Sequence, residues 1–205
     1  MQIAKEGAFY RHNLPHYRSP GCIYHCRFSV DPCFGCFTQD WMFEIVEEAI
    51  LLHNKKDCLV FAYEIMSTHT HVVLQPIPVC GHLAAWCDQR LFHRLETIAG
   101  RMKGRSSCLI NRRLCRTGNI WQRESFDRTV RNEKDLEGVI DYIHHNPVRW
   151  NLVVRPEEYR WSSAYTIYSG DQKYAGWLDL PLELHGSSDT SQPVGKGFSL
   201  PKKTG

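Results

Sequence analysis

Two histidines separated by one residue, His69 and His71, open a stretch rich in β-branched and apolar residues that ends near position 76. Side chains two positions apart on a strand point to the same face of the sheet. Two imidazoles on one face form a pair of possible metal ligands. Because the chain holds 11 histidines, two unrelated polar residues at a strand edge are the alternative interpretation.

A second pair of functional side chains lies further along the chain, in a helical pattern over residues 133–145 that Pro147 ends. Tyr142 and Asn146 are four positions apart, so they lie on one helical face. A tyrosine hydroxyl is a possible nucleophile toward phosphorus, and an asparagine carbonyl is a possible third metal ligand. The alternatives are a core aromatic residue and a helix-terminal asparagine.

Basic residues are concentrated between these two pairs. Residues 101–131 contain nine Lys and Arg against two acids, a net charge of +7 in a chain whose total is +3. Such a concentration is typical of a phosphate-binding surface, although a solvated helix gives the same pattern. Candidate DNA contacts in this segment are Lys103, Arg105, Arg112, Arg113, Arg116, Trp121, Gln122 and Arg123. Trp121 suits stacking on an unpaired base, and a buried tryptophan that anchors a strand is the alternative.

The composition excludes several classes of protein. Hydrophobic residues make up 42% and charged residues 23% of 205 positions, which is ordinary for a globular chain. The first 20 residues contain no apolar leader, and no run approaches a membrane span. Nine cysteines are then expected to be free thiols in a reducing cytoplasm. A zinc site built from Cys22, Cys26, Cys33 and Cys36 is the alternative.

The predicted elements alternate in a way that indicates the fold class. Strands are expected over 22–30, 58–65, 71–76 and 125–131, and helices over 40–54, 82–105, 133–145 and 156–169, with a loop over 106–118. This order favours an α+β, ferredoxin-like sandwich with a mostly antiparallel sheet of four to five strands and helices on one face. We expect an arm over 1–20, one domain over 21–170, and an extension over 171–205 that is disordered from about 184.

Several motifs together resemble one known family. Residues 66–74, MSTHTHVVL, are similar to the M-P-N-H-x-H-hydrophobic signature of the single-strand tyrosine transposases. The pairs Trp121-Gln122 and Leu152-Val153, with the segments 142–149 (YIHHNPVR) and 161–165 (WSSAY), resemble the REP-associated branch, whose hallmark is W-Q … Y-I-x-x-N-P-V-x-x-x-L-V … W-S-S. Residues 13–17 (NLPHY) and 24–28 (YHCRF) also fit that branch, so the resemblance covers about residues 10–170.

The resemblance implies an HUH single-strand DNA endonuclease and transposase on a ferredoxin-like fold. His69, His71 and Asn146 would hold a divalent cation, Mg or Mn, and Tyr142 would be the nucleophile. The substrate would be single-stranded DNA at palindromic hairpin repeats, joined to the protein through a 5′-phosphotyrosine. The protein would act as a monomer or homodimer in the bacterial cytoplasm, associated with the nucleoid. Ser67-Thr68 replaces the family's usual Pro-Asn, and Thr70 its usual hydrophobe, which leaves the ligands in place but changes the turn that presents them.

Three other functions remain open at this point. A nucleic-acid-binding protein with a decayed site would use the same basic segment without catalysis. A zinc-stabilised module would use the cysteines and histidines. A metal-dependent hydrolase would use the histidine pair and release a free 5′-phosphate with no protein–DNA adduct.

Overall fold

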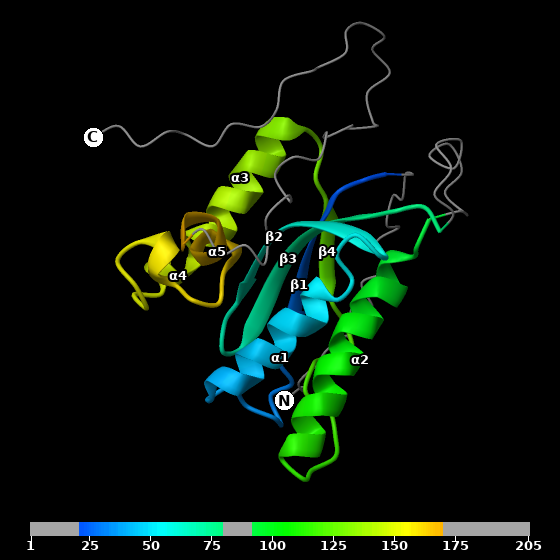
Figure 1. The fold of residues 1–205 in the computed structure, drawn as a ribbon, viewed down its shortest axis with the longest axis vertical. Helices are drawn as coiled ribbons and strands as arrows, with labels where there is room; N and C mark the ends of the chain where they lie inside the picture. The colour runs from blue at the N-terminus through cyan, green and yellow to red at the C-terminus, as the bar shows by residue number, and fades with distance from the viewer. Residues whose placement is uncertain (1–20, 80–91, 170–205) are drawn as a thin grey trace, which may run out of the picture.

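The computed structural model describes residues 21–79 and 92–169. The elements in chain order are β1 (Tyr24–Ser29), α1 (Asp40–Leu51), β2 (Cys58–Ile65), β3 (His69–Pro76), α2 (Leu95–Arg113), β4 (Phe126–Thr129), α3 (Glu133–His144), α4 (Asn146–Arg149), a 3-10 helix η3 (Pro156–Glu158) and α5 (Ser163–Ser169) (Figure 1). The expected arm over 1–20 and extension over 171–205 lie outside the described residues, as does the first part of the helix expected over 82–105.

The four strands form one antiparallel sheet in the order β2-β3-β1-β4. The β-α-β-β-α-β succession with this order is the ferredoxin-like arrangement, so the predicted α+β class is confirmed. Beyond β2, Ser162 bridges to Glu64, and the Ile65 N–H donates to the Trp161 carbonyl. This segment covers an edge strand that would otherwise offer its backbone for pairing.

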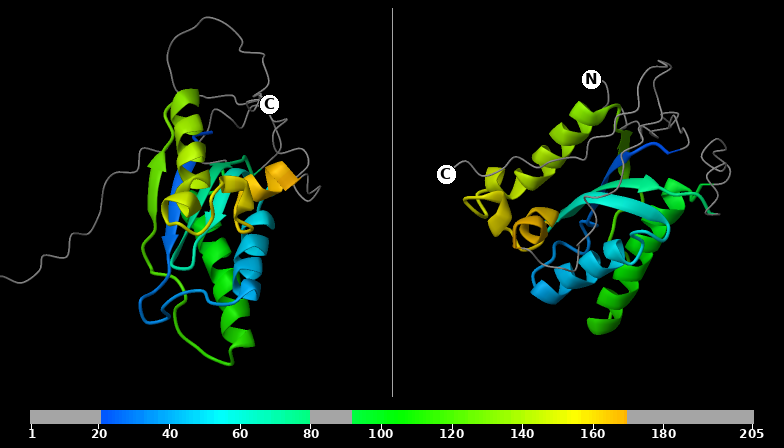
Figure 2. Two further views of the ribbon diagram at one scale, coloured as in Figure 1. Left: turned by 90° about the vertical axis from the view of Figure 1, so that its left-hand side faces the viewer. Right: turned by 45° about the horizontal axis from the view of Figure 1, so that its top comes forward.

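Helices lie on both faces of the sheet, and the expectation of helices on one face is wrong. A large apolar core forms where Cys26 and Phe28 of β1 pack with Val46 of α1 and Ile98 of α2. A smaller cluster joins the opposite face to α3. The right-hand view of Figure 2 shows the sheet between α3 on one side and α1 with α2 on the other. The sequence could not predict this, because the three strand-to-helix connections (β1 to α1, β3 to α2 and β4 to α3) give no sign of which face of the sheet each helix covers.

Two of the predicted helix boundaries move by about two turns. Helix α2 continues to Arg113, so the loop expected from 106 begins later. Met102, Ser106 and Ile110 are all buried and are spaced four apart, which places them on one helical face. The many basic residues around them hide this stripe in the sequence. The last helix, by contrast, begins only at Ser163 and is preceded by the short η3.

Helix α3 is fixed to the sheet by polar contacts at its first turn. The Asn132 side chain accepts a hydrogen bond from the Asp135 N–H at 2.9 Å and caps the helix. The two carboxylate oxygens of Asp135 each accept from Arg128 of β4 at 3.0 Å. Near the other end of the helix, Ile143 belongs to the smaller apolar cluster with Ala62 of β2 and Val73 of β3, so the last turn packs against these two strands. None of the helices in the described ranges is long and apolar enough to cross a membrane.

Candidate active site

The predicted histidine pair stands at the beginning of β3, directly after the turn that joins it to β2. His69 and His71 are both buried, with 6% and 4% of their surfaces exposed, and their ring centroids lie 5.1 Å apart. Their alternation along the strand places them on the sheet face that α3 covers in part, the face of Val73.

Each of these histidines uses its Nδ1 atom within the protein. His71 Nδ1 lies 2.8 Å from Nε2 of His25 on β1, and His69 Nδ1 lies 3.1 Å from the Thr68 hydroxyl. Burial lowers the pKa of His69 and of His25 to about 4, and that of His71 to about 3. All three rings are therefore neutral at pH 7. Each imidazole of the pair then has its Nε2 atom to offer a metal ion, with the ring orientation fixed from behind.

The predicted tyrosine and asparagine meet the histidine pair from the end of α3. Tyr142 is 43% exposed, and its ring centroid lies 6.0 Å from that of His71. The guanidinium of Arg149 lies 4.8 Å from the Tyr142 ring centroid. Asn146 is not on the same helix as Tyr142, because α3 ends at His144 and Asn146 is the first residue of α4, directly before Pro147. The turn keeps the helical sense, so the two side chains still meet on one side.

Asn146 is buried and hydrogen-bonded to a carboxylate that the sequence analysis did not single out. Its Nδ2 donates to Oε2 of Glu64 on β2 at 3.0 Å. Glu64 is fully buried, and its Oε1 has no hydrogen-bond partner among the residues that the structure describes. Burial raises the pKa of Glu64 to about 8, an effect that the Asn146 hydrogen bond opposes. With Nδ2 directed to Glu64, the amide oxygen of Asn146 is the atom available to a ligand.

These donors fit a divalent cation. Two neutral imidazole nitrogens and one amide oxygen form a mixed nitrogen and oxygen set, which suits Mn better than Mg in affinity. The raised pKa leaves Glu64 largely neutral at pH 7, and a cation beside its unpartnered Oε1 would favour the ionised form. The fit therefore rests on an unsatisfied buried acceptor as well as on the identity of the ligands.

The predicted DNA contacts on α2 are not brought to the histidine pair. Arg105 and Arg112 are exposed on a helix that packs on the opposite face of the sheet. The guanidinium of Arg113 stacks on the Trp41 ring at 4.4 Å, and that of Arg116 on the Phe34 ring at 4.8 Å. These four cations therefore form a separate basic surface.

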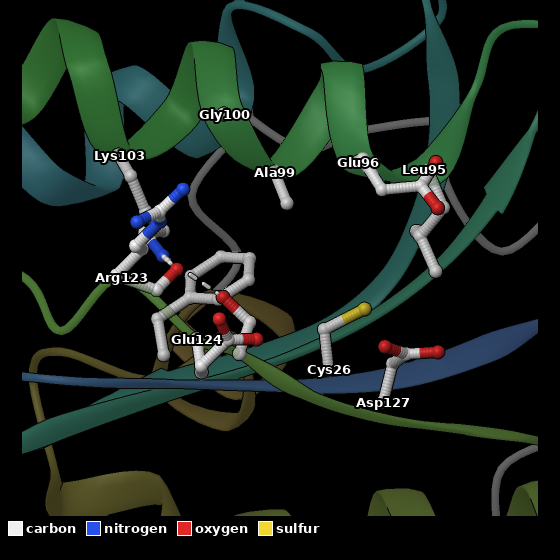
Figure 3. A pocket seen from close by; sticks show the side chains of 11 residues that line it. Cys26, Leu95, Glu96, Ala99, Gly100, Lys103, Arg123, Glu124 and Asp127 are labelled. Atoms are coloured by element: carbon white, nitrogen blue, oxygen red, sulfur yellow. Dashed lines mark hydrogen bonds between the residues drawn. The ribbon is translucent and has the colours of Figure 1, made fainter. Parts of the chain in front are cut away.

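Lys103 links α2 to the segment that precedes β4. Its ammonium group donates to the carbonyls of Gln122 and Arg123 and to the Ser125 hydroxyl at 2.8–3.0 Å. Burial lowers its pKa, although Glu124 opposes the effect. Figure 3 shows Lys103 reaching from α2 toward Arg123 across a pocket of about 230 Å³. Lys103 therefore uses its hydrogen-bond donors to fix residues 122–125, and these donors are not available to a phosphate.

Trp121 is also internal, so the alternative of a buried strand anchor is what the structure shows. Only 5% of its surface is exposed, and its indole N–H donates to the Ser106 hydroxyl at 2.9 Å. A base could stack on this ring only if the core around Phe28 and Phe37 opened. Gln122 and Arg123, by contrast, are exposed.

Three residues near the site were missed as functional. His25, Glu64 and Arg27 lie on the same sheet face as the histidine pair, because Arg27 and Glu64 both stand opposite His71 in the strand register. Arg27 is exposed, and its charge contributes to the lowered pKa of His69 and His71. One signal in the sequence could have found two of them: His25 and Arg27 are two positions apart in a predicted strand, so both side chains project from one face.

The cysteines of the zinc alternative lie in different environments. Cys26 is buried in the large core, whereas Cys33 and Cys36 are exposed in the loop after β1. Within residues 21–79 and 92–169, no three His, Cys, Asp or Glu side chains gather in a way that could hold a metal ion. The ligand set described above is compatible with that result, since its third member is an asparagine.

A curated protein and a solved structure are similar to this chain. No family model matches the chain. A curated protein of Haemophilus influenzae, named "Putative REP-associated tyrosine transposase", is 38% identical over 78 residues, which are 36% of this chain and 43% of that protein. The resemblance to the REP-associated tyrosine transposases is confirmed. The chain thus matches less than half the length of this curated relative.

A solved structure of a REP-associated tyrosine transposase bound to a REP hairpin has a similar fold. The TM-score is 0.55 at 15% sequence identity, and the match covers 98% of this chain and 100% of that chain. At this identity the match establishes the fold alone. It agrees with the ferredoxin-like order of strands described above.

Proposed function

We propose that this protein is a metal-dependent single-strand DNA endonuclease and strand transferase that acts at palindromic hairpin repeats. One observation carries the proposal: an exposed tyrosine, Tyr142, lies beside two buried neutral histidines and an amide oxygen that suit a divalent cation. The similarity to REP-associated tyrosine transposases supports the same activity.

Tyr142 would act as the nucleophile. Its hydroxyl oxygen attacks the phosphorus of the scissile phosphate after losing its proton to solvent. The bond from phosphorus to the tyrosine oxygen forms, and the bond from phosphorus to the 3′ oxygen breaks. The leaving 3′ oxygen takes up a proton and becomes a 3′-OH. The product is a 5′-phosphotyrosine, whose bond energy allows another 3′-OH to reverse the step and join two strands.

Three side chains would bind the cation, through Nε2 of His69, Nε2 of His71 and the amide oxygen of Asn146. A divalent cation held there, Mg²⁺ or Mn²⁺, would supply Lewis-acid polarisation of the scissile phosphate, which would make its phosphorus a better electrophile. His25 and Glu64 hold His71 and Asn146 in orientation from behind.

Two cations at the site would bind phosphate directly. Arg149 lies over the Tyr142 ring, and Arg27 is exposed in the register position opposite His71. Both positive charges favour the approach of a phosphodiester to the tyrosine. Their contribution, like that of the separate basic surface on α2, should fall as salt rises because DNA binding releases counterions.

The test is the formation of a covalent adduct. Labelled single-stranded hairpin DNA from the repeats that flank the protein's own gene is mixed with the protein and Mn²⁺ or Mg²⁺, denatured and run on a gel. We expect a slower band that needs the metal and is absent with Tyr142→Phe. Tyr165→Phe is the matched control, because the Tyr165 ring is also contacted by an arginine, Arg160, but belongs to a different helix, α5.

The other possible outcomes separate the alternatives. Salt-sensitive binding without an adduct in either metal would favour a nucleic-acid-binding protein with a decayed site. Cleavage that leaves a free 5′-phosphate and no adduct, unchanged in Tyr142→Phe, would favour a hydrolase.

A further inference from the structure

A single row of residues crosses all four strands at the level of the candidate active site. Glu64 of β2 stands opposite His71 of β3, His71 stands opposite Arg27 of β1, and Arg27 stands opposite Phe126 of β4. Residues directly opposite each other in antiparallel strands project from the same face. The row therefore continues from the buried site to the exposed edge of the sheet on one surface.

The outer half of this row is open to solvent. Arg27 is exposed, and Phe126 has 59% of its surface exposed. Helix α3 covers a different part of the same face, where Val73 packs against Leu136 and Val139. The assignment of faces along β4 is independently supported, because the next residue, Asp127, points the opposite way into the pocket beside α2 (Figure 3).

An exposed phenylalanine alone is ordinary, but its neighbours here are informative. Strands lie about 4.8 Å apart, so two strand spacings place Phe126 roughly 10 Å from His71 along the row. Arg27 stands between them. An aromatic ring on an open sheet surface, next to a cation, is the arrangement with which proteins stack the bases and bind the phosphates of single-stranded nucleic acids.

We propose that Phe126 is a stacking platform for one base of single-stranded DNA, and that Arg27 binds the phosphate between this base and the cleavage point. The stacked base would lie about one to two nucleotides from the bond that Tyr142 attacks. This inference rests on the proposed function and adds to it the direction in which the substrate strand crosses the sheet. It also assigns to Phe126 the stacking role that the buried Trp121 does not fill.

The charge around this surface favours a polyanionic occupant over a second protein chain. Arg27 stands beside the ring on the β1 side, and Arg149 lies over Tyr142, next to His71 in the same row. Arg128, further along β4, is engaged with Asp135. A strand of β4's length, four residues, also offers little backbone for pairing with another copy.

The experiment measures DNA binding without cleavage, in the presence of a chelator. Single-stranded hairpin DNA carries 2-aminopurine at one position at a time on either side of the cleavage point, because the fluorescence of this base falls when it stacks. We expect quenching at one position with the wild-type protein and its loss in Phe126→Ala. Affinity in Phe126→Ala should fall roughly 5- to 150-fold, whereas Phe126→Trp should keep both signals.

Two further variants make the result specific. Leu52→Ala removes another exposed apolar side chain, at the end of α1, and should change neither quenching nor affinity. Arg27→Gln should weaken binding at every DNA sequence and reduce the slope of log affinity against log salt by about one, with quenching retained at saturation.

The inference is overturned if Phe126→Ala binds DNA as the wild type does with the same quenching profile. It is also overturned if the only change is in oligomeric state by size-exclusion chromatography, which would identify a protein interface. Adduct formation is scored separately. If the adduct forms but neither binding nor quenching depends on Phe126, only this inference is contradicted. If quenching depends on Phe126 but no adduct forms, only the proposed strand transfer is contradicted.

Discussion

On the face that α1 and α2 cover, the sheet presents Tyr24, Cys26 and Phe28 to a large and mainly apolar core. On the other face, the intervening residues of the same strand are His25 and Arg27, and the neighbouring strand adds the histidine pair. The first face excludes water and contributes most of the buried apolar area. The second face buries polar groups beside the exposed side chains of Tyr142 and Arg27. The alternation of β1 therefore separates the apolar core from the candidate site.

Trp121→Ala should produce the largest effect, and only on stability. Removal of a buried tryptophan from the α1–α2 face leaves a cavity and should lower the free energy of unfolding by about 3–5 kcal/mol. Chemical denaturation checks this value. Metal affinity of the folded fraction should be unchanged. If folded Trp121→Ala instead lost DNA binding at unaltered stability, the indole would be a contact residue after all.

Glu64→Leu should have the opposite profile. Loss of the hydrogen bond to Asn146 frees the amide, and we expect Mn²⁺ affinity, measured by calorimetry, to fall about 10- to 100-fold. Glu64→Gln keeps an acceptor for Asn146 Nδ2 and should retain more of the affinity. Glu47→Leu is the matched control, because Glu47 is an equally buried carboxylate bonded to Tyr63 on the other side. Equal Mn²⁺ affinities in the wild type and the three variants would show that Glu64 does not orient the Asn146 amide.

Asp57→Asn should produce the smallest effect, on the pH dependence of stability. Burial alone would raise the pKa of Asp57, but hydrogen bonds from His53 and Arg101 outweigh it and hold the pKa below the ordinary value. A carboxylate of this kind stabilises the fold above the ordinary aspartate pKa near 4, and the contribution disappears as pH falls through the lower, folded value. Asp57→Asn should therefore lower the free energy of unfolding at pH 7 by about 1 kcal/mol.

Denaturation at several pH values tests the sign of this effect. The difference between Asp57→Asn and the wild type should narrow as the pH is lowered below 4. A constant difference from pH 7 to pH 2 would show that the aspartate acts through its shape and not through its charge.

Local patterns in the sequence predicted the parts of the site that are close in the chain. The period of two in a strand placed His69 and His71 on one face, and the helical period placed Tyr142 beside Asn146. Glu64 and Arg27 could not be found in this way, because their meeting with His71 depends on strand register. Register follows from the pairing of distant segments, and a shift of one residue would turn either side chain to the other face.

The aromatic residues illustrate the same limit. Trp121 lies five positions before Phe126, the first residue of β4. The sequence favoured Trp121 for the stacking role because Gln122 and Arg123 follow it. The structure buries the first and exposes the second. Three-dimensional packing against Phe28 and Phe37 decides this, and no local pattern reports it. The continuation of α2 was missed for a related reason, since its buried stripe is sparse among basic residues.

The row from Glu64 to Phe126 has a consequence for evolvability. Its four members come from four separate segments of the chain, and each belongs to a different strand. A change at position 126 or 27 alters what the outer surface holds without touching the segments that carry positions 64 and 71. Under the proposed function, substitutions in these two strands would change the DNA that the protein prefers, while the residues that the other two strands contribute to the site stay the same.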